Sequence, residues 1–144
     1  MDIIAPNLFL GDSADAQDVL KLKDLNIRAI LNCAFDLNVN YPSNHFISIK
    51  VGMSDGPGNI PLLYYLAQDY LRILLSQNEK VLVHCHEGRS RGASIVAYYL
   101  AIHGRISLEE AISEIAKKRQ INIHPAHVEA INKLLKEHPK EEGD

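Results

Sequence analysis

The sequence predicts an α/β fold, with a central, mostly parallel sheet of about five strands flanked by helices on both faces. Short apolar runs of strand length alternate with longer segments whose apolar residues recur every three or four positions. The run Val81-Leu82-Val83 has no polar alternation, which is typical of a strand buried on both faces. With 144 residues, 47% of them hydrophobic, the chain suffices for one domain with a substantial core.

The expected strands and helices follow from these apolar periods and from the capping and turn residues that bound them. Strands are expected at residues 3–4, 8–10, 29–33, 46–51 and 80–84. Ser13 is expected to cap a helix that carries Val19, Leu20 and Leu25. Further helices are expected near Pro61, from Arg91 to Gly104, from a capping box at Ser107 and Glu110, and near Pro125. The predicted buried face of the Pro61 helix is Leu62, Leu63, Leu66, Tyr70, Ile73 and Leu74.

Composition and charge exclude several classes of function. The 15 basic and 18 acidic side chains give a net charge of −3, which disfavours nonspecific nucleic-acid binding. The apolar runs are too short to span a bilayer, and the first residues lack the positive start of a signal peptide, so no membrane insertion is expected. Two cysteines form no disulfide scaffold, which favours a cytoplasmic location. We expect one domain over residues 1–138 and a charged, fraying tail over 139–144.

The chemistry is concentrated in residues 84–92, between a buried strand and an apolar helix. Ligands of α/β folds bind beyond the carboxyl ends of strands, and a loop entering a helix there can turn its N–H groups toward an anion. Gly88 permits such a curl, and the planar Arg91 side chain matches two phosphate oxygens. Helix N–H groups, Arg91 and His84 are expected to favour the thiolate form of Cys85, which would make it a nucleophile under a bound phosphoryl group.

Five residues separate Cys85 from Arg91, and this spacing is the signature of the cysteine-dependent phosphatases. The chain resembles a small, atypical dual-specificity phosphatase domain of the protein tyrosine phosphatase superfamily, from near its start to about Leu135. The matching segments are Leu8-Phe9-Leu10-Gly11, Ile30-Leu31-Asn32, Val81-Leu82-Val83-His84 and Ser107-Leu108-Glu109-Glu110-Ala111. The resemblance implies the cysteine-phosphatase fold and a cofactor-free, metal-free hydrolysis of phosphotyrosine and phosphoserine or phosphothreonine. It implies a phosphorylated protein as partner, and we expect a monomer.

The resemblance also implies roles for individual residues. Cys85 matches the nucleophile that forms a phosphocysteine intermediate, Arg91 the residue that stabilises the transition state, and His84 a residue that helps to hold the thiolate. The phosphate cradle matches His86, Glu87, Gly88, Arg89, Ser90 and Arg91. The family's general acid is an Asp some thirty residues before the Cys. Asp55 lies 30 residues before Cys85 and is favoured, whereas Asp36, after the third strand, is the competitor.

Three further residues have supporting or alternative roles. Asn32 matches a buried side chain that braces the phosphate loop. Gly92 departs from the family, which usually has Ser or Thr there to hydrogen-bond the departing thiolate. We therefore expect slow breakdown of the intermediate, unless Ser90 substitutes. Cys33 is interpreted as a small buried apolar residue; the alternative is a reversible disulfide with Cys85.

Other functions stay open on the sequence alone. His86 and Arg89 are basic at loop positions where lipid- and inositol-phosphate-directed relatives often carry basic residues. A polyanionic substrate such as a phosphoinositide, an inositol phosphate or an RNA 5′ end is therefore an alternative, unless Arg89 faces solvent or pairs with Glu87. A non-catalytic phosphate-binding adaptor is disfavoured, because a nucleophile, an arginine and an acid candidate are all present. The segment Lys117-Lys118-Arg119 is interpreted as a solvated helix end, and His124 and His127 as a cap and a surface residue.

Overall fold

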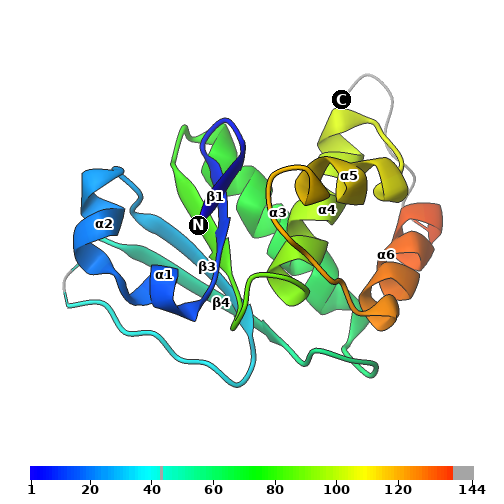
Figure 1. Cartoon of the computed structure of the whole chain (residues 1–144). Helices are drawn as coiled ribbons and strands as arrows, with labels where there is room; N and C mark the ends of the chain where they lie inside the picture. The colour runs from blue at the N-terminus through cyan, green and yellow to red at the C-terminus, as the bar shows by residue number, and fades with distance from the viewer. Residues whose placement is uncertain (43, 138–144) are drawn as a thin grey trace.

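The structure, a computed structural model, describes residues 1–42 and 44–137; the predicted tail at 139–144 lies outside them. Figure 1 shows the arrangement of the elements. In chain order they are β1 (Asp2–Ala5), β2 (Leu8–Gly11), α1 (Ser13–Gln17), α2 (Val19–Asp24), β3 (Ala29–Ala34), β4 (Ile47–Met53), α3 (Pro61–Ser76), β5 (Val81–His84), α4 (Arg91–Gly104), α5 (Leu108–Ala116) and α6 (Pro125–Glu137). None of the helices in the described ranges is long and apolar enough to cross a membrane.

The five strands of the described residues form one sheet in the order β1-β2-β5-β3-β4. Only β1 runs antiparallel to its neighbour, so the predicted, mostly parallel sheet is confirmed. Because β3, β4 and β5 are parallel, the segments that follow them leave the sheet at the same edge. These segments begin at Phe35, Ser54 and Cys85, and they include both acid candidates and the predicted nucleophile.

Side chains alternate between two buried layers across the sheet. Leu31 and Val83 pack with α3, α4, α5 and α6 on one face, whereas Ile30 and Leu82 pack on the other face with α1, α2 and part of the β3–β4 connection. Figure 1 shows the helices divided between the two sides of the sheet in this way. Helix α4 contacts β5, α3, α5 and α6, so its first turn is fixed directly after the strand that precedes Cys85.

The predicted buried face of α3 is largely wrong. Leu62 is 57% exposed and Ile73 is 43% exposed, and the buried residues are Tyr64, Ala67, Gln68, Leu71 and Leu74. Both sets of residues have helical spacing, so periodicity alone does not choose between them. The chosen face places the Tyr64 hydroxyl against a buried hydrogen-bonding partner on α6.

The expected first helix is two short helices. Asp12, rather than Ser13, caps α1 in a capping box with Asp15, and Asp18 caps α2. Each aspartate accepts a hydrogen bond from a backbone N–H three residues further on, so the chain restarts its helix at Asp18. Leu20, in this second helix, is 78% exposed.

Candidate active site

A cavity of about 240 Å³ opens at the carboxyl edge of the sheet. Its lining residues are Asp55, Cys85, His86, Glu87, Arg89, Ser90, Arg91 and Asn122. The cavity therefore brings together the predicted nucleophile and arginine, from the segment after β5, and the favoured acid, from the segment after β4. Cys85 is only 2% exposed, and its Sγ accepts a hydrogen bond from the Gly88 N–H at 3.2 Å.

Donors from other segments of the chain hold the loop after Cys85 by hydrogen bonds to its carbonyl oxygens. Four consecutive carbonyls accept hydrogen bonds: His86 O from Ser13 N–H (2.9 Å), Glu87 O from Arg119 Nη2 (2.9 Å), Gly88 O from Arg119 Nε (2.8 Å) and Arg89 O from Asn122 N–H (2.9 Å). In a trans peptide the C=O and N–H groups point in opposite directions. The N–H groups of residues 87–90 therefore turn away from these donors, toward the interior of the loop, which is the geometry of an anion cradle.

Gly88 is required at the tightest point of this loop. Its φ is +68°, a region that side chains disfavour. A Cβ there would collide with the Gly11 carbonyl oxygen and lie 2.6 Å from Arg119 Nη2. The glycine thus allows β2 and the Arg119 side chain to approach the loop closely.

Arg91, the first residue of α4, is 7% exposed and is held in place by two acceptors. Its Nη1 donates to Asp36 Oδ1 at 2.8 Å and to the Met53 carbonyl at 3.0 Å. Asp36 also lies 3.2 Å from His86 Nε2. The hydrogen bond from Arg91 is the main reason why the pKa of Asp36 lies below its usual value. Asp36 is therefore the counter-ion of Arg91, whereas Asp55 lines the cavity with Cys85.

Asp55 is held by two donors on the same oxygen. Ser90 Oγ donates to Asp55 Oδ1 at 2.6 Å, and His127 Nε2 lies 2.9 Å from that atom. Burial alone raises the pKa of this carboxyl, but the hydrogen bonds from Ser90 and His127 outweigh it, so the net pKa is lowered. The Ser90 hydroxyl also accepts the His124 N–H at 2.9 Å. Its bonding to Asp55 and His124 does not support its substitution for the missing hydroxyl at position 92.

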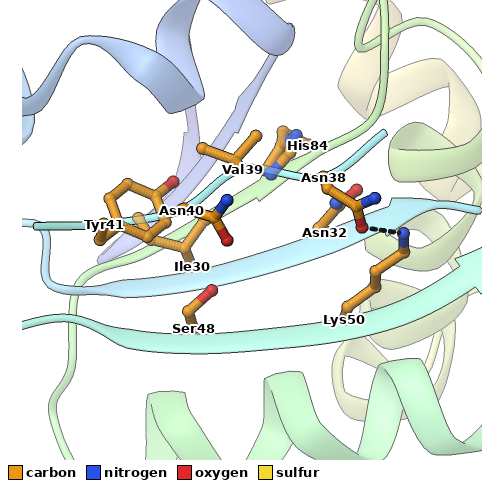
Figure 2. Close-up of a pocket in the computed structure, with 9 residues that line it drawn as sticks. All are labelled: Ile30, Asn32, Asn38, Val39, Asn40, Tyr41, Ser48, Lys50 and His84. Carbon is orange, nitrogen blue, oxygen red and sulfur yellow. Dashed lines mark hydrogen bonds between the residues drawn. The ribbon is translucent and has the colours of Figure 1, made fainter. Parts of the chain in front are cut away.

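His84, expected to help hold the thiolate, is fully buried directly before the nucleophile. Its Nδ1 lies 3.3 Å from the Cys85 carbonyl oxygen, and burial lowers the pKa of the imidazole, which favours the neutral form. The ring lines a polar cavity of about 380 Å³ on the face of the sheet that carries Ile30, shown in Figure 2. His84 therefore contacts the nucleophile through its backbone carbonyl, and its burial disfavours the charged form.

Asn32 braces a different segment from the expected one. Its Oδ1 accepts the Ala34 N–H at 2.9 Å, and its Nδ2 donates to the Leu37 carbonyl at 2.7 Å. Lys50 Nζ adds hydrogen bonds to the same turn, including the one to Asn38 Oδ1 drawn in Figure 2. These contacts fix the turn that presents Asp36 to Arg91, rather than the loop after Cys85.

The remaining predicted residues lie beside the nucleophile. Gly92 is buried, and a Cβ there would be 3.1 Å from Leu10 Cδ1 and 3.7 Å from Cys85 N. Cys33 is fully buried, and burial, together with the nearby Cys85, raises the pKa of its thiol. Both cysteines are free thiols.

Two residues of this site were missed by the sequence analysis. Arg119 was expected to be solvated, but its side chain is 13% exposed and pairs with Asp2 at 2.9 Å in addition to its two loop carbonyls. His127 was expected at the surface and is completely buried. The expected cap is present at His124, whose Nδ1 accepts the Ala126 N–H. The partners of Arg119 and His127 lie far away in sequence, so no local sequence pattern identifies the roles of these two residues.

The fold and the cavity together define a phosphatase-like α/β domain. The family of dual specificity phosphatase catalytic domains matches residues 8–136, and the chain belongs to this family. Human DUSP28 has the same fold, with 20% identity, a TM-score of 0.86 and coverage of 95% of this chain and 96% of that one. The human tyrosine phosphatase-like serine/threonine/tyrosine-interacting protein matches with 24% identity, a TM-score of 0.85 and coverage of 96% and 97%. PTPMT1 in complex with PI(5)P matches with 24% identity, a TM-score of 0.75 and coverage of 93% of each chain.

Proposed function

We propose that this phosphatase domain hydrolyses phosphotyrosine and phosphoserine or phosphothreonine on proteins through a phosphocysteine intermediate. The observation that carries the proposal is the cavity in which Cys85 Sγ lies under inward-facing N–H groups, with Arg91 and Asp55 in the same wall. A nucleophile, an oxyanion-binding cradle and a proton donor are the three parts that this chemistry needs.

The first step transfers the phosphoryl group to Cys85. The thiolate attacks phosphorus in line with the ester oxygen, and the loop N–H groups and Arg91 bind the three equatorial oxygens. The incoming phosphate takes the place of Asp36 on Arg91, because both present oxygen acceptors to the same guanidinium. Asp55 donates its proton to the leaving oxygen as the ester bond breaks.

The second step returns the enzyme to its starting state. Asp55, now a carboxylate, accepts a proton from a water molecule that attacks the phosphocysteine. The phosphorus–sulfur bond breaks, inorganic phosphate leaves, and Cys85 is again a thiolate.

The charges around the cavity favour a singly phosphorylated group over a polyanion. Glu87 and Asp55 line it together with Arg89 and Arg91, and Asp36 is paired with Arg91. Additional phosphates would therefore meet carboxylates as well as cations. Basic His86 and Arg89, and the solved complex of PTPMT1 with PI(5)P, keep a phosphoinositide as the second candidate. A non-catalytic adaptor is the third candidate.

One substrate panel tests the proposal and separates these alternatives. It contains an aryl phosphate, phosphotyrosine, phosphoserine and phosphothreonine peptides, a phosphoinositide and a triphosphorylated RNA end. We expect turnover of the phosphopeptides by the wild-type chain and none by Cys85→Ser, which should still bind a phosphate analogue such as vanadate. Turnover confined to the phosphoinositide or the RNA would contradict the substrate class. Binding without turnover in the wild type would indicate an adaptor.

A further inference from the structure

A chain of hydrogen bonds, buried at its centre, runs from Asn59, just before helix α3, through Tyr64 and His127 to Asp55. Asn59 Nδ2 lies 3.3 Å from the Tyr64 hydroxyl, the Tyr64 hydroxyl lies 2.7 Å from His127 Nδ1, and His127 Nε2 lies 2.9 Å from Asp55 Oδ1. Tyr64 is 1% exposed and His127 is fully buried. A buried polar chain of this kind must be satisfied at each atom, so it admits few proton arrangements.

A carboxylate oxygen accepts hydrogen bonds, so the nitrogen of His127 that faces Asp55 Oδ1, Nε2, is the one that carries a proton. Asn59 Nδ2 is a donor, so the Tyr64 oxygen accepts from it and its own O–H is available to His127 Nδ1. Nδ1 is then the acceptor, and Nε2–H donates to Asp55. Burial lowers the pKa of the imidazole, in agreement with a neutral ring. The hydroxyl of Tyr64 thereby selects the tautomer that can hold Asp55.

The same geometry distinguishes the two oxygens of Asp55. Oδ1 receives both Ser90 Oγ and His127 Nε2, whereas no hydrogen bond to Oδ2 occurs among the described residues. An oxygen that already accepts two hydrogen bonds has little capacity to take a proton as well. A proton on Asp55 therefore belongs on Oδ2.

We infer that His127 is a positioning residue for Asp55: with Tyr64 behind it, His127 holds Oδ1 and leaves Oδ2 as the oxygen that carries the transferred proton. The inference rests on the proposed role of Asp55 as the proton donor. Three other titratable groups interact electrostatically with Asp55 or His127: Tyr64 from α3, Arg91 at the start of α4 and His124 before α6. A change in the charge of Asp55 or His127 therefore also acts on these groups.

The first test measures protonation without turnover. In the Cys85→Ser background, the carboxyl carbon of Asp55 is titrated by NMR in otherwise wild-type protein and in His127→Leu, His127→Gln and Tyr64→Phe. Leu removes the donor, so we expect the pKa of Asp55 to rise in that variant. Gln can donate to Asp55 and accept from Tyr64, so it should keep the wild-type value, and Tyr64→Phe should fall between. Equal titration curves in all four proteins would overturn the inference.

The second test measures the dependence of kcat/KM on the leaving group, at the pH optimum of each enzyme. We expect His127→Leu to lose about tenfold on alkyl phosphates, a part of the 10²–10⁴ that general acid catalysis supplies, and far less on nitrophenyl phosphate. His127→Gln should restore the wild-type pattern, and His103→Leu, at the end of α4, controls for loss of a histidine. The alkaline limb of the pH profile should move to higher pH in His127→Leu, because its acid is weaker.

Asp55→Asn separates this inference from the function on which it rests. If Asp55→Asn loses activity selectively on poor leaving groups and the His127 variants do not, only the positioning role is overturned. If Asp55→Asn shows no such selectivity, the assignment of the acid fails and the positioning role fails with it. Thermal unfolding identifies any variant that does not fold, and Tyr64→Phe, which keeps the buried ring, then provides the decisive comparison.

Discussion

Two aspartates lie near the nucleophile, and their partners differ. Asp36 Oδ1 pairs with Arg91, whereas Asp55 lines the cavity that holds Cys85. We predict that Asp55→Asn lowers kcat/KM on phosphoserine peptides by about 10²–10⁴ and on nitrophenyl phosphate much less, because only poor leaving groups need the proton. The measurement is a series of esters of graded leaving-group pKa, with Asp36→Asn as the matched variant. A selective loss in Asp36→Asn instead would make Asp36 the acid.

The role of Asp55 as the proton donor also predicts how kcat/KM depends on pH. Asp55 must be protonated to act, so kcat/KM should fall as pH rises through its pKa. Asp55→Asn should remove that alkaline limb.

Gly92 lacks the hydroxyl that Ser or Thr would place beside the nucleophile. We predict a burst of phenol release followed by a slower steady rate, because hydrolysis of the phosphocysteine lacks a hydrogen bond to the leaving sulfur. Gly92→Ser should raise the steady rate. Gly92→Ala is the matched control, since its Cβ meets the same Leu10 Cδ1 contact at 3.1 Å without a hydroxyl. No burst in the wild type, with no gain in Gly92→Ser, would contradict the prediction.

At the scale of elements, the segment between α5 and α6 shapes the phosphate cradle through Arg119. One guanidinium holds two consecutive carbonyls, so its loss frees two peptide groups whose N–H atoms face the phosphate. We predict that Arg119→Met lowers kcat/KM by about 10²-fold, the effect of losing an oxyanion donor, and weakens vanadate binding. Arg119→Lys should not restore activity fully, because an ammonium cannot bridge both carbonyls in the same plane. Lys117→Met, at an exposed ion pair nearby, should leave both measurements unchanged.

The register of β3 and β5 places the two cysteines next to each other. Asn32 of β3 pairs with His84, the last residue of β5; Cys33 follows Asn32 within β3, and Cys85 follows directly after β5. Neighbouring strands are about 5 Å apart, within the range of a disulfide. We predict that peroxide-treated wild-type enzyme regains activity with dithiothreitol, whereas Cys33→Ala regains less, because its oxidised Cys85 has no thiol to condense with. Equal recovery would leave Cys33 as a core residue only.

The elements and the site differ in how far the sequence predicts them. Helix α4 from Arg91 to Gly104 and the Ser107 cap were predictable, because local residues decide them. The buried face of α3 was not, because two stripes have helical spacing and packing on α6 chooses between them. The nucleophile loop is one contiguous motif and was predictable as such. Arg119 and His127 act on atoms 31 and 72 residues away, and only the fold brings these atoms together.

At the scale of the molecule, the fully buried His84 and His127 predict how stability depends on pH. Burial lowers the pKa of both His84 and His127, so in the folded chain they stay neutral at a pH where unfolded histidines, with pKa near 6.5, become charged. Below about pH 6.5 the unfolded chain therefore binds more protons. The free energy of unfolding should fall with decreasing pH, by up to about 1.4 kcal/mol per pH unit for each histidine.

Carboxylates contribute to this decrease in the free energy of unfolding only at lower pH. The pKa values of Asp36 and Asp55 are lowered, so their stabilisation is complete above about pH 5 and is lost as pH falls further. The interval between about pH 6.5 and 5 thus reports mainly on the histidines. Urea unfolding across this interval should show a shallower dependence in His127→Gln than in the wild type, because Gln cannot be protonated. An unchanged slope in His127→Gln would mean that His127 takes up a proton in the folded chain, as the cationic partner of Asp55.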